Sequence, residues 1–456
     1  MPYVYAGCET LFHLVEDNFD KYFDGKEKFL LPYSQNITNK YLITYGTGLN
    51  RKNNTKLRTL GKYTKGIIKT LFSKSFMNFP KFLIEKNLLE LFIDSGGFQA
   101  TMGFLSDDEL PLFIKEYRYF IENYHHLFTR AFTLDLLLLE GKYSTEKEML
   151  YINQKSFEEL TKIDESIRKN KLLFIYHFRT KKLYRVWKQI SKDFENEFSD
   201  YYSAGGIVAT SNDNSSPILS YTVPIVYTIL AAKKRNLKNV RLHFLGGSAF
   251  TDVFTYKIFK KVVKKYHDIN LDISFDSSAA FKQVEIARFM NIIKMVDNLP
   301  IILDVDLRES NISNYQHKKY GFYKTALDML DDSIWDFLKK MKKPEYFTFY
   351  KKFPVYKDGK FIREKVFFYK MYIGYLYKMI EEVSQKFADS LDLDFDDNLF
   401  KFASFHDQVT EIMTRINKGK HSRQLKKKLN LSKTIETIKN LDLDYIDYIV
   451  ENYYEE

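Results

Sequence analysis

The sequence contains almost no cysteine and has no long apolar segment. Its single cysteine, Cys8, excludes an intramolecular disulfide and a cysteine-rich zinc site, and such scarcity is typical of a reducing compartment. No apolar run reaches the roughly 18 residues of a membrane-spanning helix, and the first residues lack a basic stretch followed by an apolar one. We therefore expect a cytoplasmic protein that has no membrane partner.

Aromatic residues and lysines are abundant instead. Aromatic side chains make up 17% of the chain and hydrophobic ones 45%, which is typical of a packed globular protein and not of a disordered one. The formal net charge of +11 suits a polyanionic partner, because lysines and arginines neutralise phosphates. A solvated lysine-rich surface would give the same charge, so the charge favours nucleic acid only weakly.

Short apolar runs alternate with longer, helix-patterned segments through the first two thirds of the chain. The runs occupy residues 41–46, 91–97, 131–139, 172–178, 201–207, 240–247, 271–277 and 300–306. Their nearly continuous hydrophobicity fits strands buried on both faces, and amphipathic connectors such as 108–124 and 145–169 fit crossover helices. The pattern predicts an α/β fold, a TIM-type (β/α)8 barrel over residues 41–306, with an open doubly wound sheet as the alternative.

The two ends of the chain differ from this pattern. Residues 1–40 are expected to be an N-terminal extension, and residues 307–456 a mainly helical, partly basic C-terminal region. Cationic residues of that region could contact a nucleic-acid backbone, although a solvated helix face fits them equally well. They include Arg415, Lys420, Arg423, Lys426 and Lys427. Asp304 and Asp306 are only two nearby acids, which on a strand pattern are more often cap and surface groups, so we predict no metal site there.

A polar segment, DSGGFQ at residues 94–99, follows directly after the second apolar run. Its two glycines allow backbone amides to approach a planar ligand, Phe98 offers a stacking face, and Asp94 supplies a carboxylate. Barrels and open α/β sheets both build their active sites at the carboxyl ends of the strands. The segment therefore predicts an active-site loop, although a glycine turn after a strand is commonplace.

This segment resembles the DSGG(F/Y)Q element of the tRNA-guanine transglycosylase superfamily, and further elements resemble that family in the same order. They are Thr133-Leu134-Asp135, Ala204-Gly205-Gly206-Ile207, Leu245-Gly246-Gly247 and Ser274-Phe275-Asp276. The resemblance spans roughly residues 90–280. It implies an enzyme, a pentosyltransferase that exchanges guanine in a nucleic acid for a 7-deazaguanine. The free base would be the co-substrate, and no cofactor is implied.

The resemblance also implies a role for each matching residue. Asp276 would attack the sugar C1′ to form a covalent glycosyl-enzyme intermediate, and Asp94 would be the general acid and base. Asp135 would accept hydrogen bonds from the guanine N1 and exocyclic amine. The other implied base-binding residues are Ser95, Gly96, Phe98, His177, Gly205, Gly206, Ile207 and Leu245.

Some of these positions have plainer interpretations. Asp135 could cap a helix, and Leu245 could belong to the core. His177 stands where the family usually has glutamine and could donate to the purine oxygen if suitably protonated, or be structural. Arg179 could contact a phosphate or act as a cap.

Two departures from the family pattern point away from transfer RNA. The family's cysteine-rich zinc motif cannot form, and the loop after Ile207 continues as Val-Ala-Thr without the glutamate of enzymes that bind the aminomethyl precursor. Both departures resemble the branch that installs 7-cyano-7-deazaguanine or a related base in bacterial and viral DNA. We therefore expect DNA as the partner, and the host cytoplasm as the location if the protein is viral.

Three other functions fit the sequence. The nearest is a tRNA-guanine transglycosylase, because no reader of a ribose 2′-hydroxyl can be identified. A non-catalytic nucleic-acid-binding barrel is a more distant alternative. An unrelated barrel that acts on a small phosphorylated metabolite would normally show a phosphate-binding loop after the last two strands, and none is evident.

Overall fold

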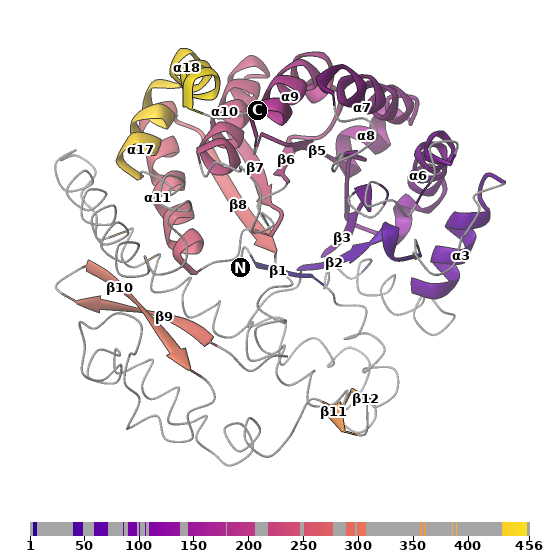
Figure 1. The fold of residues 1–456 in the computed structure, drawn as a ribbon, viewed down its shortest axis with the longest axis horizontal. Coiled ribbons are helices and arrows are strands. Elements are labelled where there is room, and N and C mark those ends of the chain that lie inside the picture. The colour runs from indigo at the N-terminus through magenta and orange to yellow at the C-terminus, as the bar shows by residue number, and fades with distance from the viewer. Residues whose placement is uncertain are drawn as a thin grey trace.

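Short apolar runs form the parallel strands of a curled central sheet (Figure 1). In chain order, seven neighbouring strands of this sheet are β2 (Lys40–Thr44), β3 (Glu90–Asp94), β4 (Arg130–Phe132), β5 (Leu172–Tyr176), β6 (Tyr201–Ala204), β7 (Asn239–Phe244) and β8 (Asn270–Asp276). They curl into a half-barrel. The first seven apolar runs are thereby confirmed as strands, and the α/β fold class is confirmed with them.

The computed structural model describes part of the chain. The described residues are 3–6, 40–48, 59–71, 85, 90–97, 100, 105, 109–136, 145–178, 180–205, 218–246, 250–276, 289–296, 299–306, 356–357, 360–361, 385, 389 and 431–453.

A short strand near the N-terminus, β1 (Tyr3–Ala6), pairs in parallel with both edge strands of the half-barrel. Tyr5 lies opposite Tyr41 of β2, and Val4 lies opposite Asp276 of β8. This strand comes from the segment 1–40, which the sequence pattern had placed outside the sheet. Four residues are too few for hydrophobic periodicity to identify a strand.

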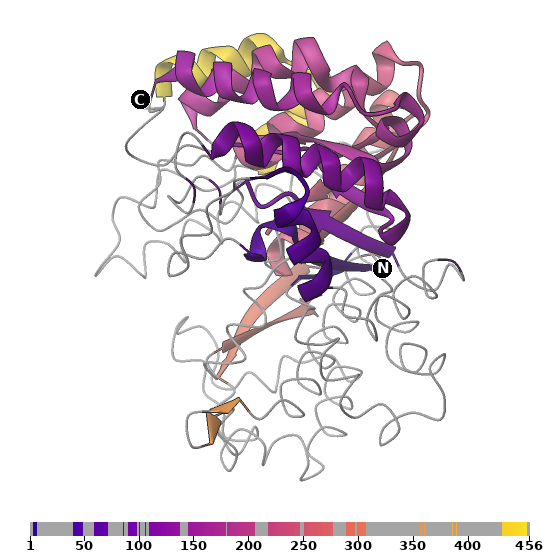
Figure 2. The ribbon, with the colours of Figure 1, turned by 90° about the vertical axis from the view of Figure 1, so that its right-hand side faces the viewer.

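The strand expected at 300–306 does not join the curled sheet, so that prediction was wrong. Leu299–Asp306 forms β10, which pairs antiparallel with β9 (Phe289–Val296). Figures 1 and 2 show this hairpin apart from the curled sheet, and β9 contacts α11. An apolar run indicates a strand without indicating its partner. Here only residues 297 and 298 separate the two strands, which permits a hairpin but not a parallel crossover. A second hairpin joins β11 (Tyr356–Lys357) and β12 (Lys360–Phe361).

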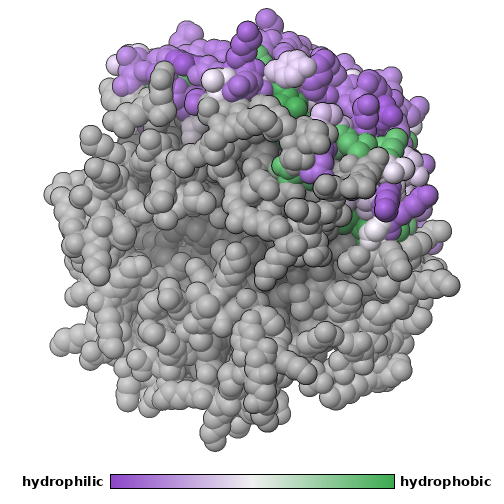
Figure 3. All heavy atoms as spheres, turned by 45° about the vertical axis from the view of Figure 1, so that its right-hand side comes forward, coloured by the Kyte–Doolittle hydropathy of each residue, from purple (hydrophilic) through white to green (hydrophobic). Residues whose placement is uncertain are grey.

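Helices cover the outside of the curled sheet, and their outer surfaces are largely hydrophilic (Figure 3). The described ones are α3 (Lys62–Leu71), α6 (Leu110–Tyr124), α7 (Glu146–Leu160), α8 (Glu165–Lys171), α9 (Lys181–Phe194), α10 (Val223–Lys234), α11 (Phe250–His267), α17 (Leu431–Asn440) and α18 (Leu443–Tyr453). The predicted helix at 145–169 is divided in two, because Asp164 accepts a hydrogen bond from the Ser166 N–H and begins α8.

The interior of the curled sheet is filled by one side chain from each of several strands. This cluster consists of Val4, Leu42, Phe92, Phe132, Leu173 and Tyr201, and the partly buried Leu245 packs against it. Successive side chains of a strand point to opposite faces, so residues two positions further along a strand also face inward. Asp94 is therefore on the same face of β3 as Phe92, nearer the carboxyl end.

The last two described helices pack on the outside of the sheet's helical layer (Figure 1). Helix α17 lies against α11, and α18 lies against α9. Tyr184 of α9 donates a hydrogen bond to Asp447 Oδ1 at 2.6 Å, and Arg185 pairs with Glu451. Ile446 and Val450 of α18 are fully buried. The C-terminal helices are thus part of the packed structure around the sheet.

We predict that Ile446→Ala lowers the free energy of unfolding by about 2–4 kcal/mol, because it leaves a cavity in a fully buried contact. Tyr448 lies on the same helix and is 53% exposed, so Tyr448→Ala should change stability by less than about 0.5 kcal/mol. Urea unfolding of the two variants checks both values. Equal losses would mean that α18 does not pack on α9 in solution.

Candidate functional site

The carboxyl ends of the parallel strands bring several predicted site residues to one edge of the sheet. Asp94 ends β3, and Asp276 ends β8. Asp135 follows β4, and His177 and Gly205 follow β5 and β6. Because parallel strands all end at the same edge, these residues lie at one end of the curled sheet. The charges of Asp135 and Asp276 both act on Asp94, which shows that the three carboxyl groups are near one another.

Asp94 has the most unusual electrostatic environment of the three carboxyl groups. Burial of its carboxyl group raises its pKa to about 7, with a further rise caused by the charge of Asp135 and a smaller one caused by Asp276. Hydrogen bonds from Gly96 and Thr44 lower the pKa without offsetting this rise; the Gly96 N–H lies 3.4 Å from Asp94 Oδ1. The side chain can therefore gain or lose a proton near neutral pH.

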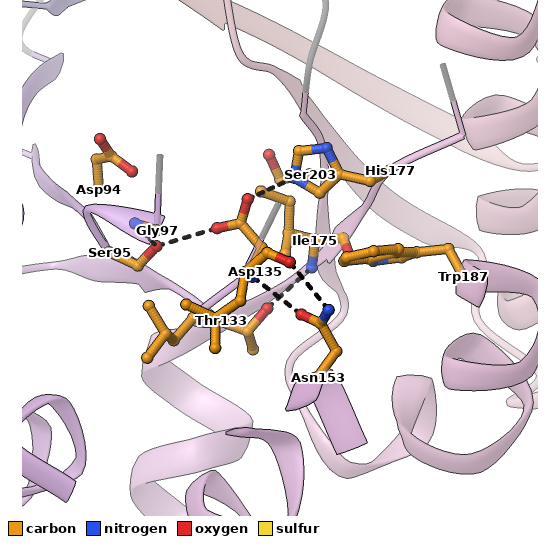
Figure 4. Close-up of polar contacts among 12 residues, drawn as sticks. Asp94, Ser95, Gly97, Thr133, Asp135, Asn153, Ile175, His177, Trp187 and Ser203 are labelled. Atoms are coloured by element: carbon orange, nitrogen blue, oxygen red, sulfur yellow. Dashed lines mark hydrogen bonds and ion pairs between the residues drawn. The ribbon is translucent and has the colours of Figure 1, made fainter. Parts of the chain in front are cut away.

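Asp135 is buried and is held on both sides (Figure 4). Ser95 Oγ donates a hydrogen bond to its Oδ1 at 3.1 Å, and His177 Nε2 lies 2.5 Å from its Oδ2. An ionised carboxylate only accepts hydrogen bonds, so the His177 ring must carry a hydrogen on Nε2. Each carboxylate oxygen has two lone pairs, so one acceptor position is left on each.

The contacts of His177 do not fit a neutral ring that donates a hydrogen bond to the base. Its Nε2 is already engaged with Asp135, and its buried Nδ1 has no hydrogen-bond partner among the described residues. With a hydrogen on Nε2, a neutral imidazole can only accept at Nδ1. The donation to a purine oxygen that the sequence suggested would therefore require an imidazolium ring. The contact with Asp135 makes His177 first of all a support for that carboxylate.

Two glycines of the predicted motifs are required by close contacts within the protein. A Cβ atom on Gly97 would lie 1.7 Å from the backbone oxygen of Asp135. A Cβ atom on Gly205 would lie 2.1 Å from Cε1 of the His177 ring. No side chain fits at either position. The glycines therefore allow the loops around Asp135 and His177 to pack against each other, whether or not a ligand is bound.

Side chains behind Asp135 and His177 fix the backbone that carries them (Figure 4). Asn153 of α7 donates to the Leu136 carbonyl and accepts from the Leu136 N–H, at 3.0 and 2.9 Å. Trp187 of α9 donates to the Ile175 carbonyl at 2.8 Å, and its ring meets the His177 ring edge-on at 5.1 Å. Neither residue belongs to a sequence motif. A polar side chain on the apolar face of a predicted helix is the pattern that could have identified them.

Asp276 is also buried, and its Oδ1 atom accepts two hydrogen bonds. His243 Nε2 lies 3.1 Å from it, and the Gly246 N–H donates to it at 3.1 Å. His243 is fully buried and stacks on Phe92 at a centroid distance of 5.8 Å. His243 belongs to none of the sequence motifs. The available signal was a polar residue at an inward position of an otherwise apolar strand.

Several predicted site residues lie outside the described part of the chain. They are Phe98, Arg179, Gly206, Ile207, Arg415, Lys420, Arg423, Lys426 and Lys427. Of the described predictions, Ser95 and Gly96 contact the aspartates, whereas Leu245 packs against the interior cluster. Leu245 is only partly buried where it packs on this cluster.

A cavity of about 630 Å³ lies at the opposite end of the sheet. It is lined by the first residues of β7 and β8 and by Lys257, Lys260, Lys261 and Lys264 of α11. Asp272 and Asp389 also line it, and Lys260 lies 3.5 Å from Asp272. Because its strand residues are at the amino ends of the strands, this cavity is separate from the three aspartates.

The described residues show no group of three His, Cys, Asp or Glu side chains that could hold a metal ion. Among the helices that the structure describes, none is long and apolar enough to cross a membrane. The carboxyl ends of the strands bring together three carboxyl groups in different environments. One can exchange a proton near neutral pH, and two are held by hydrogen-bond donors.

We predict that Asp94→Asn stabilises the protein at alkaline pH. The carboxyl group takes up its proton near pH 7 in the folded chain and near pH 3.8 in the unfolded chain. The folded state therefore binds more protons between these values, and stability falls as the pH rises through them. At pH 8 the variant should be more stable by up to about 4 kcal/mol, with little difference at pH 4.

Urea unfolding at the two pH values measures this difference. Asp200→Asn, at an exposed position, is the matched control and should change little at either pH. An Asp94→Asn variant that is no more stable than the wild type at pH 8 would show that the carboxyl group is not destabilised by its surroundings.

Comparison with known proteins does not assign this site. Neither a scan against protein-family models nor a search of curated proteins found a match for the chain. The contacts of Asp94, Asp135 and Asp276 are the features from which a function can be inferred.

Proposed function

We propose that this chain is a DNA guanine transglycosylase, which exchanges a guanine base for a 7-deazaguanine through a covalent aspartyl intermediate. The observation that carries the proposal is the meeting of three carboxyl groups at one sheet edge, in three different environments. Base exchange with retention needs a nucleophile, a group that transfers a proton, and a group that recognises the base. Asp276, Asp94 and Asp135 fit these three roles.

The first step uses Asp276 and Asp94. An oxygen of the Asp276 carboxylate forms a bond to C1′, while the bond from C1′ to the guanine nitrogen breaks and its electron pair stays with the base. The Asp94 carboxyl group, protonated in part near neutral pH, gives its proton to the departing guanine. The products are a glycosyl ester on Asp276 and a free neutral base.

The second step reverses the chemistry with a new base. The Asp94 carboxylate takes the proton from the ring nitrogen of the incoming 7-deazaguanine. That nitrogen then bonds to C1′, the ester bond to Asp276 breaks, and the carboxylate is regenerated. A group with a pKa near 7 suits both steps, because it must be an acid in one and a base in the other.

Recognition of the base is assigned to Asp135. Its two oxygens each keep one acceptor position after the hydrogen bonds to Ser95 and His177. Guanine and 7-deazaguanines present two neighbouring donors, at N1 and at the exocyclic amine. The carboxylate is therefore matched to this edge, and both substrates of the exchange have it.

We propose that β1 completes a TIM-type (β/α)8 barrel. The support is that β1 pairs with β2 on one side and with β8 on the other. In such barrels the active site lies at the carboxyl ends of the strands, where the aspartates are.

DNA is the favoured nucleic acid, and transfer RNA is the alternative. The net charge of +11 suits either one. The single cysteine and the Val-Ala-Thr that follows Ile207 favour the DNA branch and a base such as 7-cyano-7-deazaguanine. A guanine in duplex DNA would have to leave the base stack before its C1′ could be attacked.

We predict that Asp276→Asn lowers base exchange by roughly 10⁴-fold or more, because the amide is a poor nucleophile. Purified protein is incubated with 7-cyano-7-deazaguanine and matched DNA or transfer RNA, and the digested nucleosides are analysed by mass spectrometry. Asp272→Asn, on the same strand but 54% exposed at the other end, is the matched control and should keep full activity.

Incorporation into transfer RNA alone would assign the chain to the alternative substrate. Tight nucleic-acid binding without incorporation into either substrate would favour a non-catalytic barrel. Normal exchange by Asp276→Asn would rule out the proposed nucleophile.

We predict that Asp135→Asn raises the KM for the free base by about 10–100-fold, the effect of losing hydrogen bonds to a charged acceptor. The amide presents one donor and one acceptor, so it no longer matches two adjacent donors. Competition by guanine and by hypoxanthine, which lacks the exocyclic amine, measures the recognition. Wild-type protein should prefer guanine, and the variant should lose that preference. An unchanged preference would contradict the role of Asp135.

A further inference from the structure

A continuous chain of hydrogen bonds runs through the interior of the sheet to Asp276. Tyr201 OH lies 2.6 Å from Ser274 Oγ, which lies 2.8 Å from His243 Nδ1. His243 Nε2 lies 3.1 Å from Asp276 Oδ1. All four side chains are buried, and they come from three neighbouring strands, β6, β7 and β8. The pairing of β7 with β8 places His243 opposite Ser274.

The direction of the last hydrogen bond follows from the chemistry of the groups. The Asp276 carboxylate has no hydrogen to give, so His243 must donate from Nε2. Serine and tyrosine hydroxyls can each donate one hydrogen and accept others, so Ser274 can serve Nδ1 while Tyr201 serves Ser274. Aromatic neighbours fix the ring plane, because His243 packs on Phe92 and on Phe132.

The two oxygens of Asp276 are therefore not equivalent. Oδ1 accepts from both His243 and the Gly246 N–H, whereas Oδ2 accepts no hydrogen bond from any residue that the structure describes. A lone pair already engaged with two donors is less available to form a bond.

We propose that His243 is the positioning residue for Asp276, and that it selects Oδ2 as the oxygen that attacks C1′. This role rests on the proposed function. When the ester forms at Oδ2, Oδ1 becomes its carbonyl oxygen. When the ester breaks, negative charge returns to the carboxylate, and the His243 and Gly246 N–H groups are already directed at Oδ1. Such preformed donors stabilise developing charge. His243 therefore favours the second step, in which the new base displaces the enzyme.

The main test compares His243→Phe with His243→Gln. Phenylalanine keeps the ring packing but has no N–H, whereas glutamine keeps an N–H donor. Rapid-quench experiments with labelled DNA follow formation of the adduct and its resolution by 7-cyano-7-deazaguanine. In His243→Phe we expect resolution to slow by about 10–100-fold, so that the covalent adduct accumulates, with less change in its formation. His243→Gln should recover part of the resolution rate. His126→Phe, at an exposed position, should match the wild type.

A second measurement does not depend on activity. The ¹⁵N NMR spectrum of wild-type protein with labelled histidine should show His243 with a hydrogen on Nε2. Its signal, identified by its loss in His243→Gln, should shift in Asp276→Asn. An unprotonated Nε2 would overturn the proposal. So would equal slowing of both steps in His243→Phe. If the Nε2 signal is as expected but wild-type protein forms no adduct with DNA or transfer RNA, the proposed function is wrong. The catalytic role of His243 is then wrong too, whereas its hydrogen bond to Asp276 stands.

Discussion

Repulsion between three carboxyl groups at the end of one sheet is the constraint around which this site is organised. Each charge is partly or largely removed from water, so it needs hydrogen-bond donors or it must take up a proton. Asp135 has Ser95 and His177, and Asp276 has His243 and Gly246. Asp94 is left with weaker support and the charges of both neighbours, and its pKa rises to about 7. The placement of donors thus divides the three aspartates into two that are held by hydrogen-bond donors and one whose pKa lies near neutral pH.

Most of the sheet could be predicted from the sequence, because strands buried on both faces leave nearly continuous apolar runs. The errors were at the two ends of the sheet. Residues 300–306 have the same apolar signal as the other strands, yet they pair within a hairpin. The strand that contacts both edges, Tyr3–Ala6, is too short to give a periodic signal. Strand identity is a local property, whereas strand partners depend on contacts between residues far apart in the chain.

The three aspartates could be predicted because each belongs to a short motif at the end of an apolar run. The residues that determine their chemistry could not be predicted in this way. His243, Asn153 and Trp187 are distant in sequence from the groups they hold, and each lies on a strand or helix whose pattern is otherwise ordinary. The role of Gly97 and Gly205 was also incomplete from sequence alone. Their lack of a side chain serves contacts between protein loops, which only the packed structure shows.

Helix α9 connects the site to α18. The inner face of this helix carries Trp187, which bonds to Ile175 and packs against the His177 ring. Its other side carries Tyr184 and Lys188, which both bond to Asp447 of α18. Contacts thus run without a break from Asp447 of α18, through the two sides of α9, to the ring that holds Asp135. The position of His177 is therefore set by packing between helices on the outside of the sheet as well as by its own strand.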